Sequence, residues 1–442
     1  MKKIVVLGAG ESGTGAAILA KDKGYDVFLS DYGTVAPKYA AMLDAEGIEW
    51  EQGHHSLDRI LAAGEIVKSP GIADTTPVMQ AVHAAGIHVV SEIEFAGRYM
   101  PDSSRTVCIT GSNGKTTTTM LTCHILRHAG IDASTAGNIG RSLALQVARE
   151  PHAVYVIELS SFQLDNMYDF RADTAVITNI TPDHLDRYDY KFENYVAAKM
   201  RILQNMRASD TFVHWADDPV VMHEELSGCP AAQLLFADAC RDGLAACVCD
   251  GTLMLDGKPL MPVGELSLPG THNLLNSMAA ALAARSMGAE REKIAEALRT
   301  FAPVEHRLEP AGTVDGVRWI NDSKATNVNS CFYALGAMTT PTVLILGGKD
   351  KGNDYSEILP LVREKVKAIV AMGLHNEKIV EFFSPYVPVE DTHSLDDAVQ
   401  ACRRLASEGD TVLLSPCCAS FDLFKSYEDR GRRFKAAVAG LV

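Results

Sequence analysis

The chain has 442 residues and a formal net charge of −15. This length predicts two or three domains rather than a single core. The acidic balance excludes a broad basic surface for nucleic acid or membranes, and no apolar run approaches the roughly 18 residues of a membrane span. The apolar N-terminal run ends at Gly8 and is too short for a signal peptide. We therefore expect a cytoplasmic protein without nucleic-acid or membrane partners, whose ten scattered cysteines are reduced thiols.

The first two segments of the chain each begin with a strand, a glycine turn and a helix. This alternation predicts parallel sheets covered by helices. The first segment has predicted strands at residues 3–7, 26–30 and 66–68. The second has predicted strands at 106–110, 154–159 and 175–179, followed by a β-hairpin insertion within 244–268. Helices are predicted at 273–285 and 291–299.

The third segment repeats the same alternation. Its predicted strands lie near residues 317–321, 342–346, 368–372 and 411–414, with helices between them. The fold class predicted for the whole chain is therefore α/β, with mainly parallel sheets and flanking helices. We expect domain boundaries near residues 98 and 303.

The first glycine turn, Gly8 to Gly13, has the spacing of a dinucleotide-binding fingerprint. It follows a strand and opens a helix, and Asp31 ends the next strand about twenty residues later. A nicotinamide-dependent dehydrogenase would fit this pattern. So would the pyrophosphate of a UDP-sugar, or a packing turn without a ligand. A dehydrogenase with one such unit would leave the second glycine turn of the chain unexplained.

The second glycine turn predicts a phosphate-binding loop. Glycines allow backbone N–H groups to turn toward phosphate oxygens, and the following helix N-terminus adds partial positive charge. Lys115 would neutralise phosphate oxygens and the Thr116 hydroxyl would ligate Mg²⁺. Ile109 stands where the general G-x-x-x-x-G-K-[ST] pattern has glycine, so this loop is shorter. The predicted ATP-binding residues here are Gly111, Ser112, Asn113, Gly114, Lys115, Thr116 and Thr117.

Two further residues follow predicted strands near this loop. Glu158 closes an apolar strand, at the edge where open α/β sheets bind ligands, and is a natural Mg²⁺ ligand. His184 follows the next strand between Asp183 and Asp186, which favours a functional role over a structural one. Lys199 lies on a predicted helix, and composition alone indicates an exposed surface lysine.

These motifs, in this order and spacing, resemble the Mur ligases of peptidoglycan synthesis over nearly the whole chain. The further motifs that carry the resemblance are Gly137-Asn138-Ile139-Gly140, Glu158–Leu164, Asn179–Tyr188, Ala197–Arg201, His272–Asn276, Glu305-His306-Arg307, Asn321–Asn327, Ser415–Ser420 and Arg430-Gly431. Ser91 to Phe95 and the short N-terminal domain are most similar to the members that add D-glutamate.

The resemblance implies three domains: a UDP-binding Rossmann-like domain at 1–98, an ATP-binding domain at 99–303, and a Rossmann-like amino-acid-binding domain at 304–442. It implies ATP-dependent ligation of D-glutamate to UDP-N-acetylmuramoyl-L-alanine through an acyl phosphate. The expected cofactors are ATP, two Mg²⁺ ions and a CO₂-derived carbamate on Lys199. A monomer is expected.

The resemblance also implies roles for individual residues. The catalytic set is Lys115, Glu158, His184 and Lys199, and the metal ligands are Thr116, Glu158, His184 and Lys199. Further ATP contacts are Asn273, Asn276, Arg307 and Asp322. The UDP-substrate contacts are Glu11, Ser12, Asp31, Tyr32, Ser69, Asn138 and His184. The amino-acid contacts are Lys324, Thr326, Lys351, Ser420 and Tyr427.

Three other functions remain open. A folylpolyglutamate synthetase also adds glutamate to a carboxylate, but it would require a folate rather than a UDP-sugar. A dehydrogenase would bind a nicotinamide nucleotide and transfer hydride. A non-catalytic nucleotide-binding protein would bind ATP without substrate-dependent phosphate release, and the combination of the loop with Glu158, His184 and Lys199 argues against it.

Overall fold

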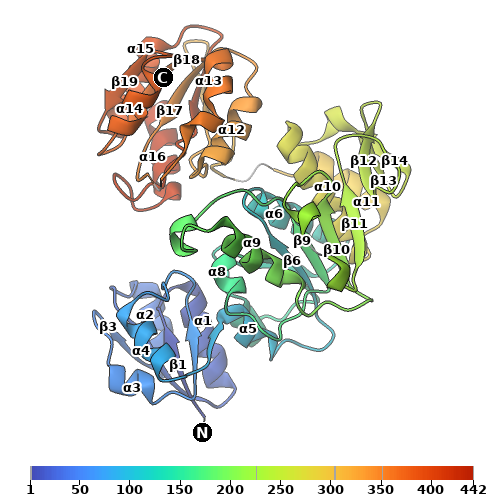
Figure 1. The fold of residues 1–442 in the computed structure, drawn as a ribbon, viewed down its shortest axis with the longest axis vertical. Helices are drawn as coiled ribbons and strands as arrows, with labels where there is room; N and C mark the ends of the chain where they lie inside the picture. The colour runs from blue at the N-terminus through green and yellow to red at the C-terminus, as the bar shows by residue number, and fades with distance from the viewer. Residues whose placement is uncertain (1, 225, 303–304, 351, 442) are drawn as a thin grey trace. The chain divides into compact units, whose positions relative to one another are not determined.

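The computed structural model describes residues 2–224, 226–302, 305–350 and 352–441. Its strands form three sheets of five, nine and six strands within these ranges. Figure 1 shows helices covering the faces of each sheet. The predicted fold class, three mainly parallel α/β domains, is confirmed.

The first sheet is parallel throughout, in the order β3-β2-β1-β4-β5. Alternate residues of β1 enter two different cores, with Ile4 and Val6 on one face and Val5 and Leu7 on the other, as expected for a strand buried on both sides. The strands are β1 Lys3–Leu7, β2 Asp26–Asp31, β3 Glu49–Gln52, β4 Glu65–Lys68 and β5 Val89–Ser91. The helices are α1 Glu11–Asp22, α2 Pro37–Ala45, α3 Leu57–Leu61, α4 Pro77–Ala84 and α5 Glu92–Gly97.

The second sheet has the order β14-β13-β12-β11-β10-β9-β6-β8-β7. It is parallel from β7 to β12, and the predicted hairpin insertion is the antiparallel set β12, β13 and β14. The strands are β6 Arg105–Thr110, β7 Ala133–Gly137, β8 Val154–Glu158, β9 Thr174–Ile177, β10 Thr211–Trp215, β11 Ala232–Phe236, β12 Ala246–Cys249, β13 Thr252–Leu255 and β14 Lys258–Pro262. The helices are α6 Lys115–His128, α7 Leu143–Arg149, α8 Ser161–Leu164, α9 Phe192–Met200, α10 Thr271–Ser286 and α11 Arg291–Thr300.

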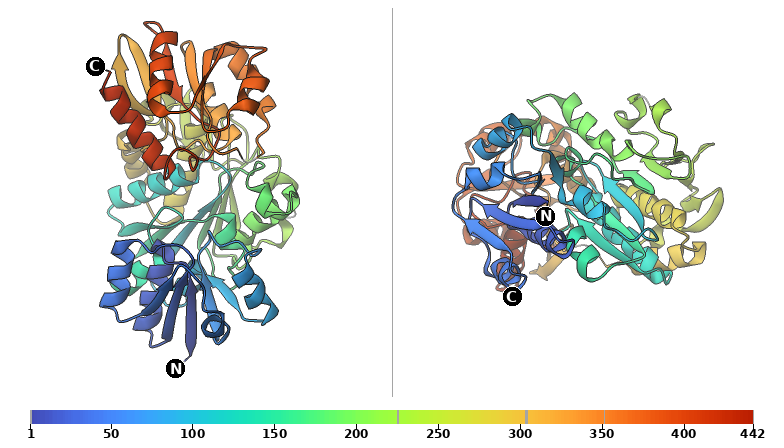
Figure 2. Two further views of the ribbon diagram at one scale, coloured as in Figure 1. Left: turned by 90° about the vertical axis from the view of Figure 1, so that its left-hand side faces the viewer. Right: turned by 90° about the horizontal axis from the view of Figure 1, so that it is seen from below.

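The third sheet has the order β15-β16-β20-β17-β18-β19 and is parallel except for β15. Helices cover both of its faces (Figure 2), and alternate residues of β17 enter two separate cores. The strands are β15 Glu309–Val314, β16 Val317–Asn321, β17 Thr342–Leu346, β18 Val366–Met372, β19 Val389–Thr392 and β20 Thr411–Leu414. The helices are α12 Val328–Gly336, α13 Leu359–Lys365, α14 Glu377–Phe383, α15 Leu395–Leu405 and α16 Tyr427–Ala439.

The chain divides into two compact units. One comprises residues 1–266 and 275–300 and holds the first two sheets, and the other comprises 267–274 and 301–442 and holds the third. The domain boundaries at 98 and 303 stay predictions, and residue 303 lies outside the described residues.

Two buried carboxylates of α5 join the first sheet to the second. Glu94 accepts hydrogen bonds from the backbone N–H groups of residues 168–170. Glu92 Oε1 accepts hydrogen bonds from Ser142 Oγ and Ala144 N, both at 2.7 Å. Burial raises the pKa of Glu92 to about 7, although these hydrogen bonds act in the opposite direction.

A raised carboxyl pKa makes the folded state lose stability as pH increases. Between about pH 4.5 and 7 the folded protein keeps a proton on Glu92 that the unfolded chain releases. The free energy of unfolding should therefore fall by about 3 kcal/mol across this window. Glu92→Gln should remove this fall, measured as urea midpoints at pH 5 and pH 8. The exposed Glu193→Gln variant is the control and should retain it; equal pH profiles for Glu92→Gln and the parent chain would contradict the assignment.

Candidate active site

The predicted phosphate loop connects β6 to α6, as its sequence requires. Gly111 and Gly114 both have positive φ, at +145° and +83°. Lys115 Nζ donates hydrogen bonds to the carbonyl oxygens of Gly111, at 2.8 Å, and Ser112, at 2.9 Å. Thr116 is buried in the first turn of α6. The loop thus has the strand-to-helix geometry of a phosphate-binding loop.

The chain that follows β9 holds the loop in place. Ser112 N donates to Asn179 O at 2.8 Å, and Asn113 N donates to Asn179 Oδ1 at 3.0 Å. Thr178 Oγ1 donates to Asn113 O at 2.5 Å, and Ser112 Oγ donates to Thr181 O at 2.7 Å. Sequence reasoning did not assign Thr178 or Asn179 to the site; their place directly after a strand that neighbours β6 is the signal that could have found them.

Glu158 lies at the end of β8 and is 2% exposed. Its Oε1 atom accepts a hydrogen bond from Asn138 Nδ2 at 2.8 Å. Its Oε2 atom is buried and has no hydrogen-bond partner among the described residues. A buried carboxylate oxygen without a donor suits a cation ligand. The structure thus brings together Asn138, predicted as a contact of the UDP-linked substrate, and Glu158, predicted as a metal ligand.

Lys199 is buried rather than exposed, so the reading from composition alone is wrong for this residue. It lies on α9, is 1% exposed, and donates from Nζ to Gly111 O at 2.7 Å. Burial lowers the pKa of Lys199 well below its ordinary value, and the nearby charge of Lys115 lowers it further. Asp183 and Glu158 oppose this shift. The amine therefore has a strongly reduced tendency to carry a proton.

His184 follows β9 in a left-handed conformation, with φ of 54°. Its ring lies 5.3 Å from the Phe162 ring, centroid to centroid. The distance from His184 Nε2 to Asp183 Oδ2 is 3.7 Å. The same Asp183 carboxylate acts on the pKa of Lys199. The acidic residue beside His184 thus links His184 and Lys199 electrostatically.

The N-terminal glycine turn is built for close backbone approach. A side chain at Gly8, which has φ of +95°, would lie 2.6 Å from Ser69 Oγ. Asp31 Oδ2 accepts a hydrogen bond from Ala9 N at 2.6 Å. The Ser69 hydroxyl is buried without a hydrogen-bond partner among the described residues, and Tyr32 is 74% exposed. Three predicted UDP contacts thus lie at strand ends: Asp31 is the last residue of β2, Tyr32 follows it, and Ser69 follows β4.

Glu11 and Ser12 are the first two residues of α1. Glu11 Oε2 accepts a hydrogen bond from Tyr39 OH at 3.1 Å, and Glu11 Oε1 accepts one from Ser142 N at 3.3 Å. Ser142 N-caps α7 of the second sheet. Glu11 therefore reaches from the glycine turn to the segment that begins with Asn138.

The predicted ATP contacts divide between the two compact units. Asn276 belongs to the first, where its Oδ1 accepts a hydrogen bond from Thr118 Oγ1 at 3.3 Å. The second unit contains Asn273, Arg307 and Asp322. Asp322 accepts hydrogen bonds from Ser415 Oγ, at 2.8 Å, and Leu308 N, at 3.2 Å. Burial raises the pKa of Asp322 to about 7.

Among the predicted amino-acid contacts, Lys324 and Thr326 follow β16, Ser420 follows β20, and Tyr427 begins α16, all in the second unit. Lys324 Nζ lies 5.2 Å from the centroid of the Tyr427 ring. Thr326 follows in the same turn, where its N–H donates to Lys324 O at 2.9 Å. Ser420 is buried. Lys351 lies outside the described residues. The roles of all these residues stay predictions.

Arg430 holds this region together from within. It is fully buried, and its guanidinium donates to Ser323 Oγ at 2.9 Å, to Ser323 O at 2.8 Å and to Cys418 O at 3.2 Å. Burial lowers the pKa of Arg430 to about 10. Arg430 thus joins α16, which begins with Tyr427, to the segment that contains Lys324.

The cysteine expectation is wrong in one place. Cys240 and Cys249 form a disulfide, with their Cα atoms 5.1 Å apart. The loop after β11 returns alongside β12 and so brings together two cysteines that are nine residues apart. Among the described residues, no helix combines the length and the apolar character needed to cross a membrane.

Gly111→Ala tests the phosphate loop. A methyl group there would lie 2.0 Å from Thr178 Oγ1 and 3.0 Å from Asn179 O, so the loop would have to move. We expect ATP binding, measured by calorimetry, to weaken at least about tenfold. Gly130→Ala is the matched control, because Gly130 also has positive φ but a methyl group there would meet open space. That variant should lose about 1 kcal/mol of stability and keep its ATP affinity. Parental ATP affinity in Gly111→Ala would refute the assignment.

Comparison with known proteins identifies the family. Residues 2–91 match the Mur ligase MurD-like N-terminal domain, residues 109–284 the Mur ligase middle domain, and residues 306–418 the Mur ligase glutamate ligase domain. The chain is 56% identical to a UDP-N-acetylmuramoylalanine–D-glutamate ligase of Bacteroides fragilis, over 100% of both chains. The corresponding ligase of Porphyromonas gingivalis is 54% identical over 99% of this chain and 98% of its own.

Solved structures agree in fold. A UDP-N-acetylmuramate–alanine ligase, MurC, of Thermotoga maritima is similar over 100% of both chains, with a TM-score of 0.64 and 20% identity. The FolC protein of E. coli, solved with ADP, matches 79% of this chain and 92% of its own, with a TM-score of 0.60 and 17% identity. The three matched domains and the full-length relatives show that the chain belongs to the Mur ligase family.

Proposed function

We propose that this Mur ligase joins D-glutamate to UDP-N-acetylmuramoyl-L-alanine, with ATP as the energy source, in peptidoglycan precursor synthesis. The observation that carries the proposal is the 56% identity, over 100% of both chains, to a ligase named for this reaction. The site chemistry agrees with it, because a phosphate loop, a buried carboxylate and a buried lysine meet at one sheet edge. We further propose a cytoplasmic, monomeric enzyme.

The reaction requires activation of a carboxylate, which is a poor electrophile. An oxygen of the L-alanine carboxylate attacks the γ-phosphorus of ATP, and ADP leaves, which gives an acyl phosphate. The amine of D-glutamate then attacks the carbonyl carbon, loses a proton, and phosphate leaves from the tetrahedral intermediate. Lys115 and the loop N–H groups would offset the negative charge on the transferred phosphoryl group. Positioning of three substrates would supply much of the remaining rate enhancement.

Residues of the chain fit a magnesium site beside the loop. Thr116, Glu158, His184 and Lys199 would hold the metal, and two Mg²⁺ ions are expected. The buried, unpartnered Oε2 atom of Glu158 supports this assignment. When bound, Mg²⁺ would neutralise charge on the phosphate oxygens.

We propose that Lys199 carries a CO₂-derived carbamate. An ammonium would repel Mg²⁺, whereas a carbamate would offer an anionic oxygen. Only the neutral amine is nucleophilic toward CO₂, and burial together with the charge of Lys115 favours that form of Lys199. The 2.7 Å hydrogen bond to Gly111 O supports a position at the phosphate loop.

The remaining predicted contacts divide by substrate. Glu11, Ser12, Asp31, Tyr32, Ser69, Asn138 and His184 would bind the UDP-linked substrate. Lys324, Thr326, Lys351, Ser420 and Tyr427 would bind the amino acid, where a cation such as Lys324 suits the carboxylates of glutamate. The contact between Glu11 and Ser142 supports a UDP-substrate site that draws on the first two sheets.

Lys199→Ala should reduce turnover by at least about 100-fold, because it removes a proposed metal ligand beside the transferred phosphoryl group. Short carboxylic acids should restore part of the activity by replacing the carbamate oxygens. Lys191→Ala is the matched control, since Lys191 immediately precedes α9 but is exposed. Full activity of Lys199→Ala without any added acid would remove the proposed role.

The function is tested by measuring phosphate release and amide formation together. The assay contains ATP, Mg²⁺ and UDP-N-acetylmuramoyl-L-alanine with D-glutamate, L-glutamate, L-alanine or diaminopimelate. We expect phosphate release only in the mixture that contains D-glutamate, with one amide bond formed per phosphate released. A parallel reaction with a reduced folate and L-glutamate tests the other glutamate-adding activity considered for the sequence. Turnover only with folate, or none in any mixture, would overturn the proposal.

A further inference from the structure

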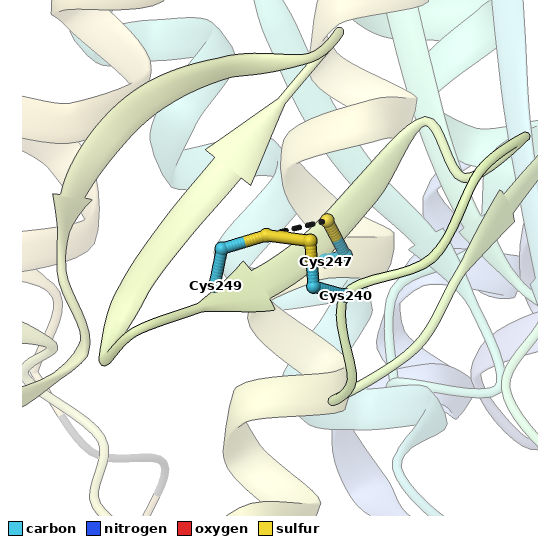
Figure 3. Close-up of side chains that lie close together, drawn as sticks. All are labelled: Cys240, Cys247 and Cys249. Atoms are coloured by element: carbon cyan, nitrogen blue, oxygen red, sulfur yellow. Dashed lines mark hydrogen bonds between the residues drawn. A yellow bond between two sulfur atoms is a disulfide. The ribbon is translucent and has the colours of Figure 1, made fainter.

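Three cysteine sulfurs lie close together in the second sheet, several strands away from the phosphate loop. Cys247 and Cys249 are two residues apart on β12, and Cys240 lies in the loop between β11 and β12 (Figure 3). The ligand atoms of all three lie within 4.8 Å of one another. Strand β12 is separated from β6 by β11, β10 and β9 in the sheet order. This sulfur cluster is therefore distinct from the proposed ligase site.

The spacing of the sulfurs suits thiolate ligands around one ion. A tetrahedral zinc ion with Zn–S bonds of about 2.3 Å places its sulfur ligands about 3.8 Å apart. The Sγ atoms of Cys247 and Cys249 are already 3.8 Å apart. Their positions two residues apart on one strand direct both side chains to the same face. Two of the three sulfurs thus lie on the same face of one strand and at metal-ligand spacing.

The third sulfur belongs to a residue that is free to adjust. Cys240 is exposed in its loop, whereas Cys247 is buried and Cys249 is half-buried. In the structure Cys240 is bonded to Cys249. Once that bond is reduced, a small movement of the exposed loop would bring the Cys240 sulfur to ligand spacing. The exposed side of the cluster would leave a fourth position for water.

The ligand set selects the class of cation. Three thiolates form a soft donor set, which favours zinc over hard cations such as Mg²⁺. The same sulfurs cannot bind zinc when two of them form a disulfide. We propose that Cys240, Cys247 and Cys249 form a zinc-binding site that is available in the reduced protein and closed by the Cys240–Cys249 disulfide.

The chemistry balances with an external two-electron reductant. A phosphine reduces the disulfide and becomes a phosphine oxide with oxygen from water, while Cys240 and Cys249 each receive a hydrogen. Zinc binding then displaces one proton from each of the three thiols. A small-molecule disulfide would re-form the Cys240–Cys249 bond, would itself be reduced to two thiols, and would thereby release the ion.

The test is a zinc titration of the full chain after phosphine reduction, in excess Mg²⁺ and against a chromophoric chelator. The Mg²⁺ occupies oxygen-ligand sites and leaves thiolates available. We expect one tightly bound zinc per chain. Cys240→Ser and Cys247→Ser should each weaken zinc affinity more than about 100-fold, because the loss of even an outer-shell partner lowers metal affinity about 10- to 100-fold. Cys229→Ser is the control, a half-buried thiol outside the cluster, and should bind like the parent chain.

Because Cys240 is exposed, Cys240→Ser should not disturb folding. Circular dichroism should show an unchanged fold in this variant. Protein oxidised to the Cys240–Cys249 disulfide should lose the tight zinc. Equal zinc affinity in the parent chain and Cys240→Ser would overturn the proposal, as would equal affinity before and after oxidation. Ligase activity does not enter this readout.

Discussion

The carbonyl oxygen of Gly111 accepts hydrogen bonds from two lysines, Lys115 and Lys199. Two ammonium groups beside one carbonyl in a buried site would repel each other, so burial and mutual charge favour an uncharged amine at Lys199. Gly111 belongs to the phosphate loop, so the two hydrogen bonds to its carbonyl oxygen also hold the loop in place. The position of the phosphate loop and the chemical state of Lys199 therefore depend on the same contact.

This contact requires a glycine at position 111, because a residue with a side chain would not fit there. Gly111 has φ of +145°, and a Cβ at this position would lie 2.0 Å from Thr178 Oγ1 and 3.0 Å from Asn179 O, just after β9. Parallel strands end at one sheet edge, so β6, β8 and β9 bring the loop, Glu158 and His184 to that edge together. Because helices cover the faces of the sheet, the proposed ligand site lies at this edge rather than on a face. It also places the hydrogen bond between Asn138 and Glu158 beside the loop.

Much of this could be predicted from sequence because its signals are local. Apolar runs such as 3–7, 342–346 and 411–414 are strands, and the two glycine turns do connect a strand to a helix, β1 to α1 and β6 to α6. Glu158 was recognisable because it directly follows an apolar run. The hairpin of β12 to β14 was recognisable from its glycines at 251 and 257.

The remainder depends on packing between distant segments. Nothing in the sequence around Lys199 indicates burial, since its helix reaches Gly111 only through the tertiary fold, 88 residues away. The Thr178 and Asn179 contacts with the loop span 65 and 66 residues. The disulfide depends on the path of the loop after β11. The short strands β3, β5, β15 and β19 lacked strong apolar runs and became visible only as members of their sheets.

In the proposed mechanism the substrate carboxylate is phosphorylated before the amide bond forms. The most direct measurement uses UDP-N-acetylmuramoyl-L-alanine labelled with ¹⁸O in its carboxylate and follows the label by mass spectrometry during turnover with ATP and D-glutamate. An acyl phosphate predicts that one ¹⁸O atom passes to each released phosphate. Phosphate without ¹⁸O, formed together with the amide product, would contradict this mechanism.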